Sequence, residues 1–115
     1  MVARRQLPAA SLHVVLALLE GDKHGYAVMR DVEKLSDGAV KMGPGTLYGT
    51  IKRLLADGLI VEVTDDVVAD PDAERRRYYR LTAGGEQVAA TEVARLRTLV
   101  HRVARFRPDF GTGIA

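Results

Sequence analysis

The hydrophobic period of this 115-residue chain changes at Gly58, and this change limits the folds that the chain can adopt. Before Gly58, apolar residues recur at steps of three and four, as they do on amphipathic helices. Directly after it, the segment LIVEVT at 59–64 is β-branched and partly alternating, which is typical of a strand. A helical pattern resumes at Thr82 and runs to about Arg107. The chain is therefore expected to be mainly α-helical with a small β-hairpin.

Three short helices are expected before Gly58. The first is apolar on more than one side, with Ser11 as a candidate N-cap and Gly21 as its end. The second has Asp22 as a candidate N-cap and stops at the Ser-Asp-Gly of 36–38. The third closes at Gly58 and carries an apolar stripe with helical spacing. The stripe consists of Leu47, Ile51, Leu54 and Leu55.

After Gly58 the sequence indicates a two-stranded hairpin. A turn-rich segment, DDVVADPDAE, separates 59–64 from RRRYYRL at 75–81, which pairs aromatic with basic residues. A lone hairpin is only marginally stable, so this one has to pack on the helices. Tyr78 and Tyr79 would point to opposite faces of the second strand, which places one of them in the core.

The order helix, helix, helix, hairpin, long helix is that of a winged helix-turn-helix followed by a dimerisation helix. We expect the winged helix-turn-helix domain at 1–81, the dimerisation helix at 82–107 and a loose tail at 108–115. The dimer contact is assigned to an apolar stripe on the last helix, which alternates steps of three and four. The stripe consists of Val93, Leu96, Leu99, Val100, Val103 and Phe106.

Several classes of function are disfavoured by the composition. The chain has no cysteine, which excludes a disulfide framework and cysteine-ligated zinc. His13 and His101 have no tight cluster of further ligands around them, so no metal and no other cofactor is expected. Ser11 and Ser36 both stand at predicted helix ends, and no nucleophile, base and orienting group come together, so an enzyme is not expected.

The N-terminal segment has basic residues before an apolar stretch, as a secretory signal peptide does. That stretch is short, ends at Glu20 and has no convincing small-residue cleavage site. No apolar run reaches the length of a membrane span. The simpler prediction is a cytoplasmic protein. Its net charge is only +2, so affinity for a polyanion would depend on where the charges lie.

The third predicted helix begins with Gly-Pro-Gly. Gly43 suits the N-cap and Pro44 the first helical position, and the next free N–H groups would then face an anion such as a phosphate. Gly49, inside the helix, costs about 1 kcal/mol relative to alanine, which indicates that another molecule comes close there. A polar face with two cations is usually just a solvated face, so this face alone does not establish DNA binding. Its polar residues are Thr46, Tyr48, Thr50, Lys52 and Arg53.

Three segments carry a resemblance to a known family: HGYAVMRDV at 24–32, GTLYGTIKRLLADGLI at 45–60 and RRYYRLTAGG at 76–85. They resemble the PadR family of winged helix-turn-helix transcriptional regulators, in its smaller branch with a single short C-terminal helix. The resemblance runs in order from residue 12 to about 105. It implies a homodimeric, cytoplasmic protein that binds double-stranded DNA, usually a repressor on an inverted-repeat operator. In some members a small-molecule effector releases the DNA.

The resemblance also implies which residues meet DNA. Tyr26 and Tyr48 fall on tyrosines near the DNA backbone, the polar residues of the third helix fall on its groove-facing side, and 75–77 fall at the base of the wing. Lys41, just before the third helix, is a further candidate for a phosphate contact. The full predicted set is Tyr26, Lys41, Thr46, Tyr48, Thr50, Lys52, Arg53, Arg75, Arg76 and Arg77.

The predicted wing departs from the family in its charge. Residues 62–74 hold six acidic and no basic side chains. Carboxylates repel DNA at contact distance, so either the tip points away or the wing contributes only through its arginine strand, which we favour. The acidic tip would also suit a different class of function, a winged-helix module that binds a protein partner without specific DNA binding. The sequence identifies neither an operator nor an effector.

Overall fold

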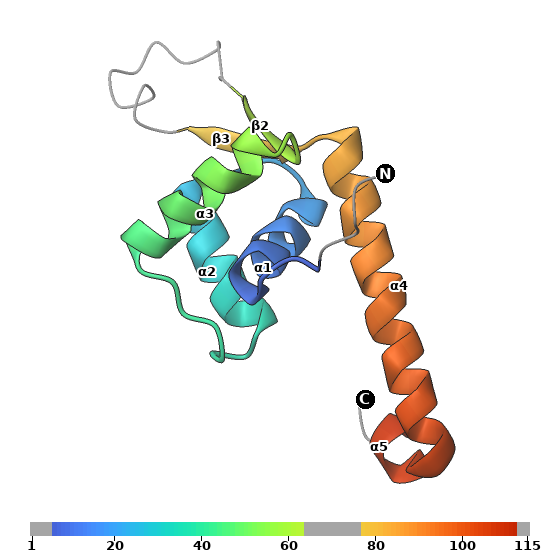
Figure 1. Cartoon of the computed structure of the whole chain (residues 1–115). Helices are drawn as coiled ribbons and strands as arrows, with labels where there is room; N and C mark the ends of the chain where they lie inside the picture. Colours follow the sequence, from blue (N-terminus) through green and yellow to red (C-terminus); the bar gives the residue numbers. More distant parts are fainter. Residues whose placement is uncertain (1–5, 64–76, 113–115) are drawn as a thin grey trace.

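The computed structural model describes residues 6–63 and 77–112 of the chain (Figure 1). A helical body carries a small sheet at one edge, and one long helix stands beside the body. The predicted mainly α-helical fold with a small β-element and a long last helix is confirmed. In chain order the elements are α1 (Ala9–Ala17), the 3₁₀ turn η1 (Leu18–Glu20), β1 (Lys23–His24), α2 (Gly25–Leu35), α3 (Pro44–Ala56), β2 (Ile60–Val63), β3 (Tyr78–Leu81), α4 (Ala83–Phe106) and α5 (Pro108–Thr112).

Helix α1 lies at the centre of the hydrophobic core. Val14 and Val15 are fully buried, because α2, α3 and α4 all pack against this helix. The predicted cap was wrong. Pro8 is the N-cap residue and its carbonyl accepts the first helical hydrogen bond, from the Leu12 N–H at 2.9 Å. Ser11 therefore lies within the first turn, where it is buried.

Helix α2 is capped by His24 and not, as predicted, by Asp22. The Nδ1 atom of His24 accepts a hydrogen bond from the backbone N–H of Ala27 at 3.3 Å. Asp22 cannot cap the helix, because the Arg80 guanidinium holds its carboxylate through hydrogen bonds of 2.9 and 2.7 Å. His24 is thus a structural residue at a helix start. The predicted stop at 36–38 is also confirmed.

Helix α3 begins and ends as predicted. Gly43 is the N-cap residue, with extended backbone (φ −76°, ψ 168°), and Pro44 is the first helical residue. Gly58 follows the C-terminus with φ 74°, in the left-handed region that favours glycine. The apolar stripe packs against α1 and α2. Its buried members are Leu47, Ile51 and Leu54.

The wing sheet is larger than the predicted hairpin. Strands β2 and β3 pair antiparallel, from Ile60 opposite Leu81 to Val63 opposite Tyr78. Strand β1 pairs with the other edge of β3, so the described residues form a sheet of three strands in the order β1-β3-β2. With only two residues, β1 is too short to show a strand period in the sequence. Tyr79 is buried and Tyr78 half-buried, as alternation predicted.

A junction of four residues, the Thr82 junction, fixes the start of α4 to the start of β2. The Thr82 N–H donates to the Leu59 carbonyl at 3.0 Å, and its hydroxyl donates to the Gly58 carbonyl at 2.7 Å. The same hydroxyl oxygen accepts from the Gly85 N–H at 3.0 Å, so Thr82 is the predicted N-cap. A Cβ at Gly85 would lie 2.0 Å from the Leu59 carbonyl oxygen. Only glycine allows this approach.

Helix α4 packs against α1 in part and then extends beyond the helical body (Figure 1). The prediction of a loose tail from residue 108 was wrong over Pro108–Thr112, which form α5 against the end of α4. Arg107 stabilises this turn. Its guanidinium donates hydrogen bonds of 3.1 and 2.8 Å to the Asp109 carboxylate and lies 4.1 Å from the centre of the Phe110 ring.

Candidate nucleic-acid interface

The two sides of α3 differ in burial and in polarity. The inner side carries the apolar stripe, whereas the outer side carries every residue of this helix that the sequence assigned to DNA. Thr50 is half-buried and the others are exposed, including both cations. These side chains can therefore reach a second molecule, and their contact with DNA stays a prediction. The residues are Thr46, Tyr48, Thr50, Lys52 and Arg53.

The N-terminus of α3 is open to solvent. Its first residues, from Gly43 to Thr46, are exposed. The Gly43 carbonyl accepts the first helical hydrogen bond, from the Leu47 N–H at 3.0 Å, and Gly43 has no side chain that could cap the free N–H groups. Those groups carry the positive end of the helix dipole. An anion is therefore favoured at this position.

Two exposed tyrosines lie at the start of α2. Tyr48 extends from α3 across Gly25, where a Cβ would lie 2.6 Å from the Tyr48 hydroxyl oxygen. Tyr26 follows Gly25 in the chain, and its ring stacks on the His24 ring with centroids 6.5 Å apart. The Arg30 guanidinium lies over the Tyr26 ring, 5.4 Å from its centroid. The fold thus brings the two predicted backbone-contacting tyrosines to one end of α2.

Gly49 lies in the middle of the outer face of α3. Apart from its two chain neighbours and the adjoining backbone of α3 itself, no described atom lies within 4 Å of the position that a Cβ would take there. Glycine costs about 1 kcal/mol relative to alanine inside a helix. The packing of the described residues therefore gives no reason for this glycine, and the space above it is open to a second molecule.

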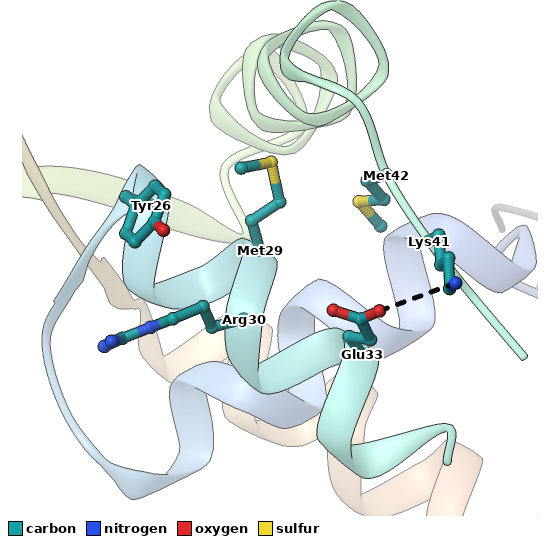
Figure 2. Close-up of a pocket in the computed structure, with 6 residues that line it drawn as sticks. All are labelled: Tyr26, Met29, Arg30, Glu33, Lys41 and Met42. Atoms are coloured by element: carbon teal, nitrogen blue, oxygen red, sulfur yellow. Dashed lines mark ion pairs between the residues drawn. The ribbon is translucent and has the colours of Figure 1, made fainter. Parts of the chain in front are cut away.

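Beside the N-terminus of α3 lies an open notch of about 290 Å³ (Figure 2). It is formed by one side of α2 and by the two residues that precede Gly43. The ammonium of Lys41 lies 3.9 Å from the Glu33 carboxylate across its rim, and both side chains are largely exposed. The lining residues are Tyr26, Met29, Arg30, Glu33, Lys41 and Met42.

The wing contributes one described arginine to the candidate interface. Arg77 is exposed, and its Nε lies 3.3 Å from the Glu62 carboxylate on the neighbouring strand. Arg75 and Arg76 lie outside the described residues, as does the acidic segment at 65–74. The predictions about these residues therefore stay predictions.

Ion pairs on both sides of β1 hold the wing to α2. The hydrogen bond from Arg80 lowers the pKa of the Asp22 carboxyl below its ordinary value. Lys23 contacts the carboxylates of Asp31 and Glu20. Burial alone would lower the pKa of Lys23, but the hydrogen bonds to these two carboxylates outweigh it and raise the pKa. These contacts fix the sheet, and Arg77 directly precedes its strand β3.

The apolar stripe of α4 lies far from the outer face of α3 and is largely open. Leu99 is 52% exposed, Val100 45% and Phe106 73%, which is high for apolar side chains on a packed helix. The remaining stripe residues, Val93, Leu96 and Val103, are half-buried. The structure thus leaves the predicted dimer contact free for a partner.

A groove of about 530 Å³ also runs along α4. Beside it, Glu92 is buried, and the guanidinium of Arg95 donates to its carboxylate at 3.1 Å. The lining is mixed in polarity, and none of its members is aromatic. They are Gln6, Thr91, Ala94, Arg95, Thr98, Leu99 and Arg102.

Some residues at these sites were missed by the sequence analysis. Arg30 was not assigned to the interface, because its contact with Tyr26 depends on a one-turn spacing that many helices share. Glu92 stands at a position of the helical pattern where a polar side chain is expected to face solvent. Its burial depends on how α4 packs, so the pattern did not predict it. The pairing of Asp22 with Arg80 joins residues 58 positions apart, for which no local signal exists.

Two kinds of feature are absent from the described ranges, 6–63 and 77–112: a membrane-spanning helix and a metal-binding cluster. No helix there combines the length and the apolarity that a membrane span requires. No three His, Cys, Asp or Glu side chains in these ranges are grouped so that they could hold a metal ion.

The arrangement of elements is that of a winged helix-turn-helix protein with an added C-terminal helix. Solved structures share this fold. A transcriptional regulator from Clostridium thermocellum has a TM-score of 0.67 at 23% identity, covering 84% of this chain and 88% of that chain. A PadR family transcription regulator from Clostridium difficile R20291 has a TM-score of 0.65 at 20% identity, covering 86% and 98%.

Sequence comparison defines the family. The transcriptional regulator PadR-like family matches residues 15–91 of the chain. The transcriptional regulator Rv3488 of Mycobacterium tuberculosis (strain ATCC 25618 / H37Rv) is 33% identical over 98 residues, which is 85% of each chain. The chain belongs to the PadR-like family of transcriptional regulators, and regulators of this kind are normally not enzymes.

Proposed function

We propose that this chain is a sequence-specific DNA-binding regulator of transcription that acts as a homodimer. The observation that carries the proposal is the outer face of α3. This face is polar, bears the exposed cations Lys52 and Arg53, and begins at an open helix N-terminus. In its middle is Gly49, for which the packing of the described residues gives no reason. A helix of this kind suits the DNA major groove in both size and chemistry.

The proposed contacts divide into two kinds. Phosphate contacts from Tyr26, Lys41, Tyr48 and the wing arginines at 75–77 would fix the position of the protein on the duplex. Contacts with base edges would come from the polar side chains near the middle and end of α3 and would select the sequence. The residues proposed for base contacts are Thr50, Lys52 and Arg53.

The dimer would form through the apolar stripe of α4. Pairing of two such helices buries the exposed Leu99, Val100 and Phe106, which favours association. The two copies of α3 would then lie on one side of the dimer. Each would enter the major groove of one half-site of an inverted repeat, with the half-sites about 34 Å apart. Binding there would repress transcription by blocking the polymerase.

Regulation by a small-molecule effector is proposed from the family resemblance. A ligand between the first and last helices would change the spacing of the two copies of α3, provided that it binds one spacing more tightly than the other. The groove along α4, lined by Gln6 and by residues of α4, is one described space beside the last helix. Its lining has no aromatic residue, which does not favour flat aromatic compounds as effectors. The proposed location of the regulator is the cytoplasm.

The rival proposal is a winged-helix module that binds a protein partner without specific DNA binding. The acidic residues of 62–74 and the net charge of only +2 favour it. A positively charged patch on an otherwise nearly neutral protein can bind DNA, whereas an acidic wing is better suited to a basic protein surface.

Selection of bound duplexes from a random and a genomic pool, followed by binding measurements across a salt series, separates the two proposals. A regulator is expected to bind selected sequences about 10³-fold or more tightly than random duplex at moderate salt. Lys52→Ala and Arg53→Ala should remove this preference, whereas Lys34→Ala, an exposed cation on α2 outside the interface, should leave it intact. If no sequence is bound better than random duplex at low salt, the regulator proposal fails.

A further inference from the structure

The notch beside α3 has an unusual combination of side chains. Its two methionines, Met29 and Met42, offer an apolar floor, and Met42 is buried. In Figure 2, Arg30 and Lys41 extend on opposite sides of this floor. The notch ends directly before Gly43, the N-cap of α3. An apolar floor between two cations, next to an open helix N-terminus, fits a molecule with an apolar unit between two negative charges.

Arg30 is held in place without being neutralised. Its guanidinium lies 5.4 Å from the centroid of the Tyr26 ring, and that ring stacks in turn on His24. Within the described residues, Arg30 has no carboxylate within the 4 Å of an ion pair. A cation over an aromatic face keeps its full charge and its N–H donors. Arg30 is therefore ready to donate to an anion.

Lys41, on the other side, is only weakly neutralised. Its ammonium lies 3.9 Å from the Glu33 carboxylate, and the exposed fractions of the two side chains are 74% and 53%. An exposed pair at this distance is weak and gives way to a stronger partner. Glu33 also adds a negative charge next to any anion in the notch. The carboxylate therefore competes with that anion for Lys41.

We propose that the notch seats one nucleotide of the DNA backbone, with its deoxyribose over Met29 and Met42 and its two flanking phosphates facing Arg30 and Lys41. The sugar is the apolar unit and the phosphates are the two charges. Glu33 limits the affinity by holding Lys41 and by repelling the backbone. This inference rests on DNA binding, the basis of the proposed function. It adds Arg30 as a contact and Glu33 as a residue that weakens binding.

Salt dependence of DNA binding tests the proposal with three variants of the full-length protein. Each lost phosphate contact lowers the slope of log K against log salt by about 0.9. Arg30→Gln is expected to weaken binding several-fold, to the same extent on the selected operator and on a random duplex of equal length, and to lower the slope by about 0.9. Glu33→Gln is expected to tighten binding several-fold. Lys34→Gln, on the same helix outside the notch, measures the effect of any lost charge and should change both quantities least.

A second measurement locates the contact on the DNA. Methylphosphonate groups replace the operator phosphates one at a time and remove their charge. At one position, this replacement should weaken binding of the wild type about as much as Arg30→Gln does and should not weaken the Arg30→Gln variant further. All substituted side chains are exposed, so unchanged thermal unfolding is expected and is checked for each variant.

The outcomes separate this inference from the proposed function. If Arg30→Gln behaves as Lys34→Gln does, if Glu33→Gln fails to tighten binding, or if every methylphosphonate acts equally on wild type and Arg30→Gln, the notch does not seat the backbone. If the wild type binds all duplexes equally, specific regulation fails. The comparison of variants on random duplex then still supports or overturns the backbone contact.

Discussion

Gly49 in α3 and Gly85 in α4 are both helical glycines, but their surroundings are opposite. A Cβ at Gly85 would lie 2.0 Å from the Leu59 carbonyl oxygen, whereas one at Gly49 would have no described atom within 4 Å beyond its chain neighbours and the adjoining backbone of α3. Either glycine lowers the stability of its helix. At Gly85 the close approach of β2 and α4 explains the residue, and at Gly49 the described chain does not. The Thr82 junction is therefore organised for stability, and the outer face of α3 is open for another molecule.

The largest expected effect is that of Gly85→Ala. The added methyl group meets backbone, which cannot rotate away, so the start of α4 has to move from β2 and the hydrogen bonds of Thr82 are strained. Overpacking against a fixed neighbour costs about 3 kcal/mol or more. Denaturant unfolding of the purified variant measures the loss in free energy of unfolding.

Gly84→Ala is the matched control for this prediction. A Cβ at Gly84 would lie 3.6 Å from the Thr82 hydroxyl oxygen and 3.9 Å from the Gly58 carbonyl oxygen, which are ordinary contacts. Alanine there is expected to stabilise the protein by about 0.5–1 kcal/mol. Equal effects of the two substitutions would contradict the role assigned to Gly85.

The next largest effect tests whether the apolar stripe of α4, like the outer face of α3, contacts another molecule, here a second copy of the chain. Leu96→Glu combined with Val100→Glu places charges on the half-open apolar stripe. Two buried, unpaired carboxylates would weaken the proposed dimer by several kcal/mol and yield monomers at micromolar concentration. Analytical ultracentrifugation measures the change. Arg105→Glu, an exposed substitution on the other side of α4, should leave the dimer intact, and a dimer that survives the double substitution would place the interface elsewhere.

Gly49→Ala tests the other half of the comparison and is expected to change two properties in opposite directions. Helix stability should rise by about 1 kcal/mol, because alanine is the better helix former and the site has room for its methyl group. Affinity for the selected operator should fall about tenfold, or 1.4 kcal/mol, because the methyl group occupies space that DNA needs. Thermal unfolding and operator binding measure the two effects. Raised stability with unchanged binding would mean that the glycine is incidental.

Helix boundaries and the core could be predicted because the signals for them are local. Gly43, Pro44 and Gly58 mark the ends of α3 in the sequence as clearly as in the structure. The same local reading failed at Ser11 and Asp22. Both residues are good N-caps in isolation, but one is buried in the first turn and the other is held by the wing.

The candidate site was predictable where it follows one helix and not where it joins several elements. Thr46, Lys52 and Arg53 lie on one face of α3, as the helical period requires. The short strand β1 forms by pairing with β3, and Arg30 lies over Tyr26 on α2. No period or motif in the sequence encodes either arrangement. The family resemblance supplied DNA as the expected partner of this face, which periodicity alone leaves open.

The smallest expected effect is that of breaking the ion pair between Asp22 and Arg80. This pair tests whether the contacts that stabilise the fold extend from the Thr82 junction to β1. Arg80 lowers the pKa of Asp22 below its ordinary value of 3.8, so the ion pair stabilises the folded chain above that pH. As the pH falls through the lowered pKa, the carboxylate takes up a proton and the contribution is lost. Asp22→Asn should therefore lower the melting temperature slightly at neutral pH and not at all in strong acid. The effect is small because both side chains are partly exposed.

A double-mutant cycle assigns this effect to the pair itself. If Asp22 acts through Arg80, Asp22→Asn should cost nothing further in an Arg80→Gln background at neutral pH. A cost that persists in that background would mean that Asp22 stabilises the turn before β1 in another way. If Asp22→Asn causes no loss of stability in the Arg80→Gln background, the contacts that stabilise the fold extend from the Thr82 junction across β3 to β1. These contacts would then include the whole described sheet. The outer face of α3 with its neighbouring notch, like the apolar stripe of α4, would lie outside them and remain open to another molecule.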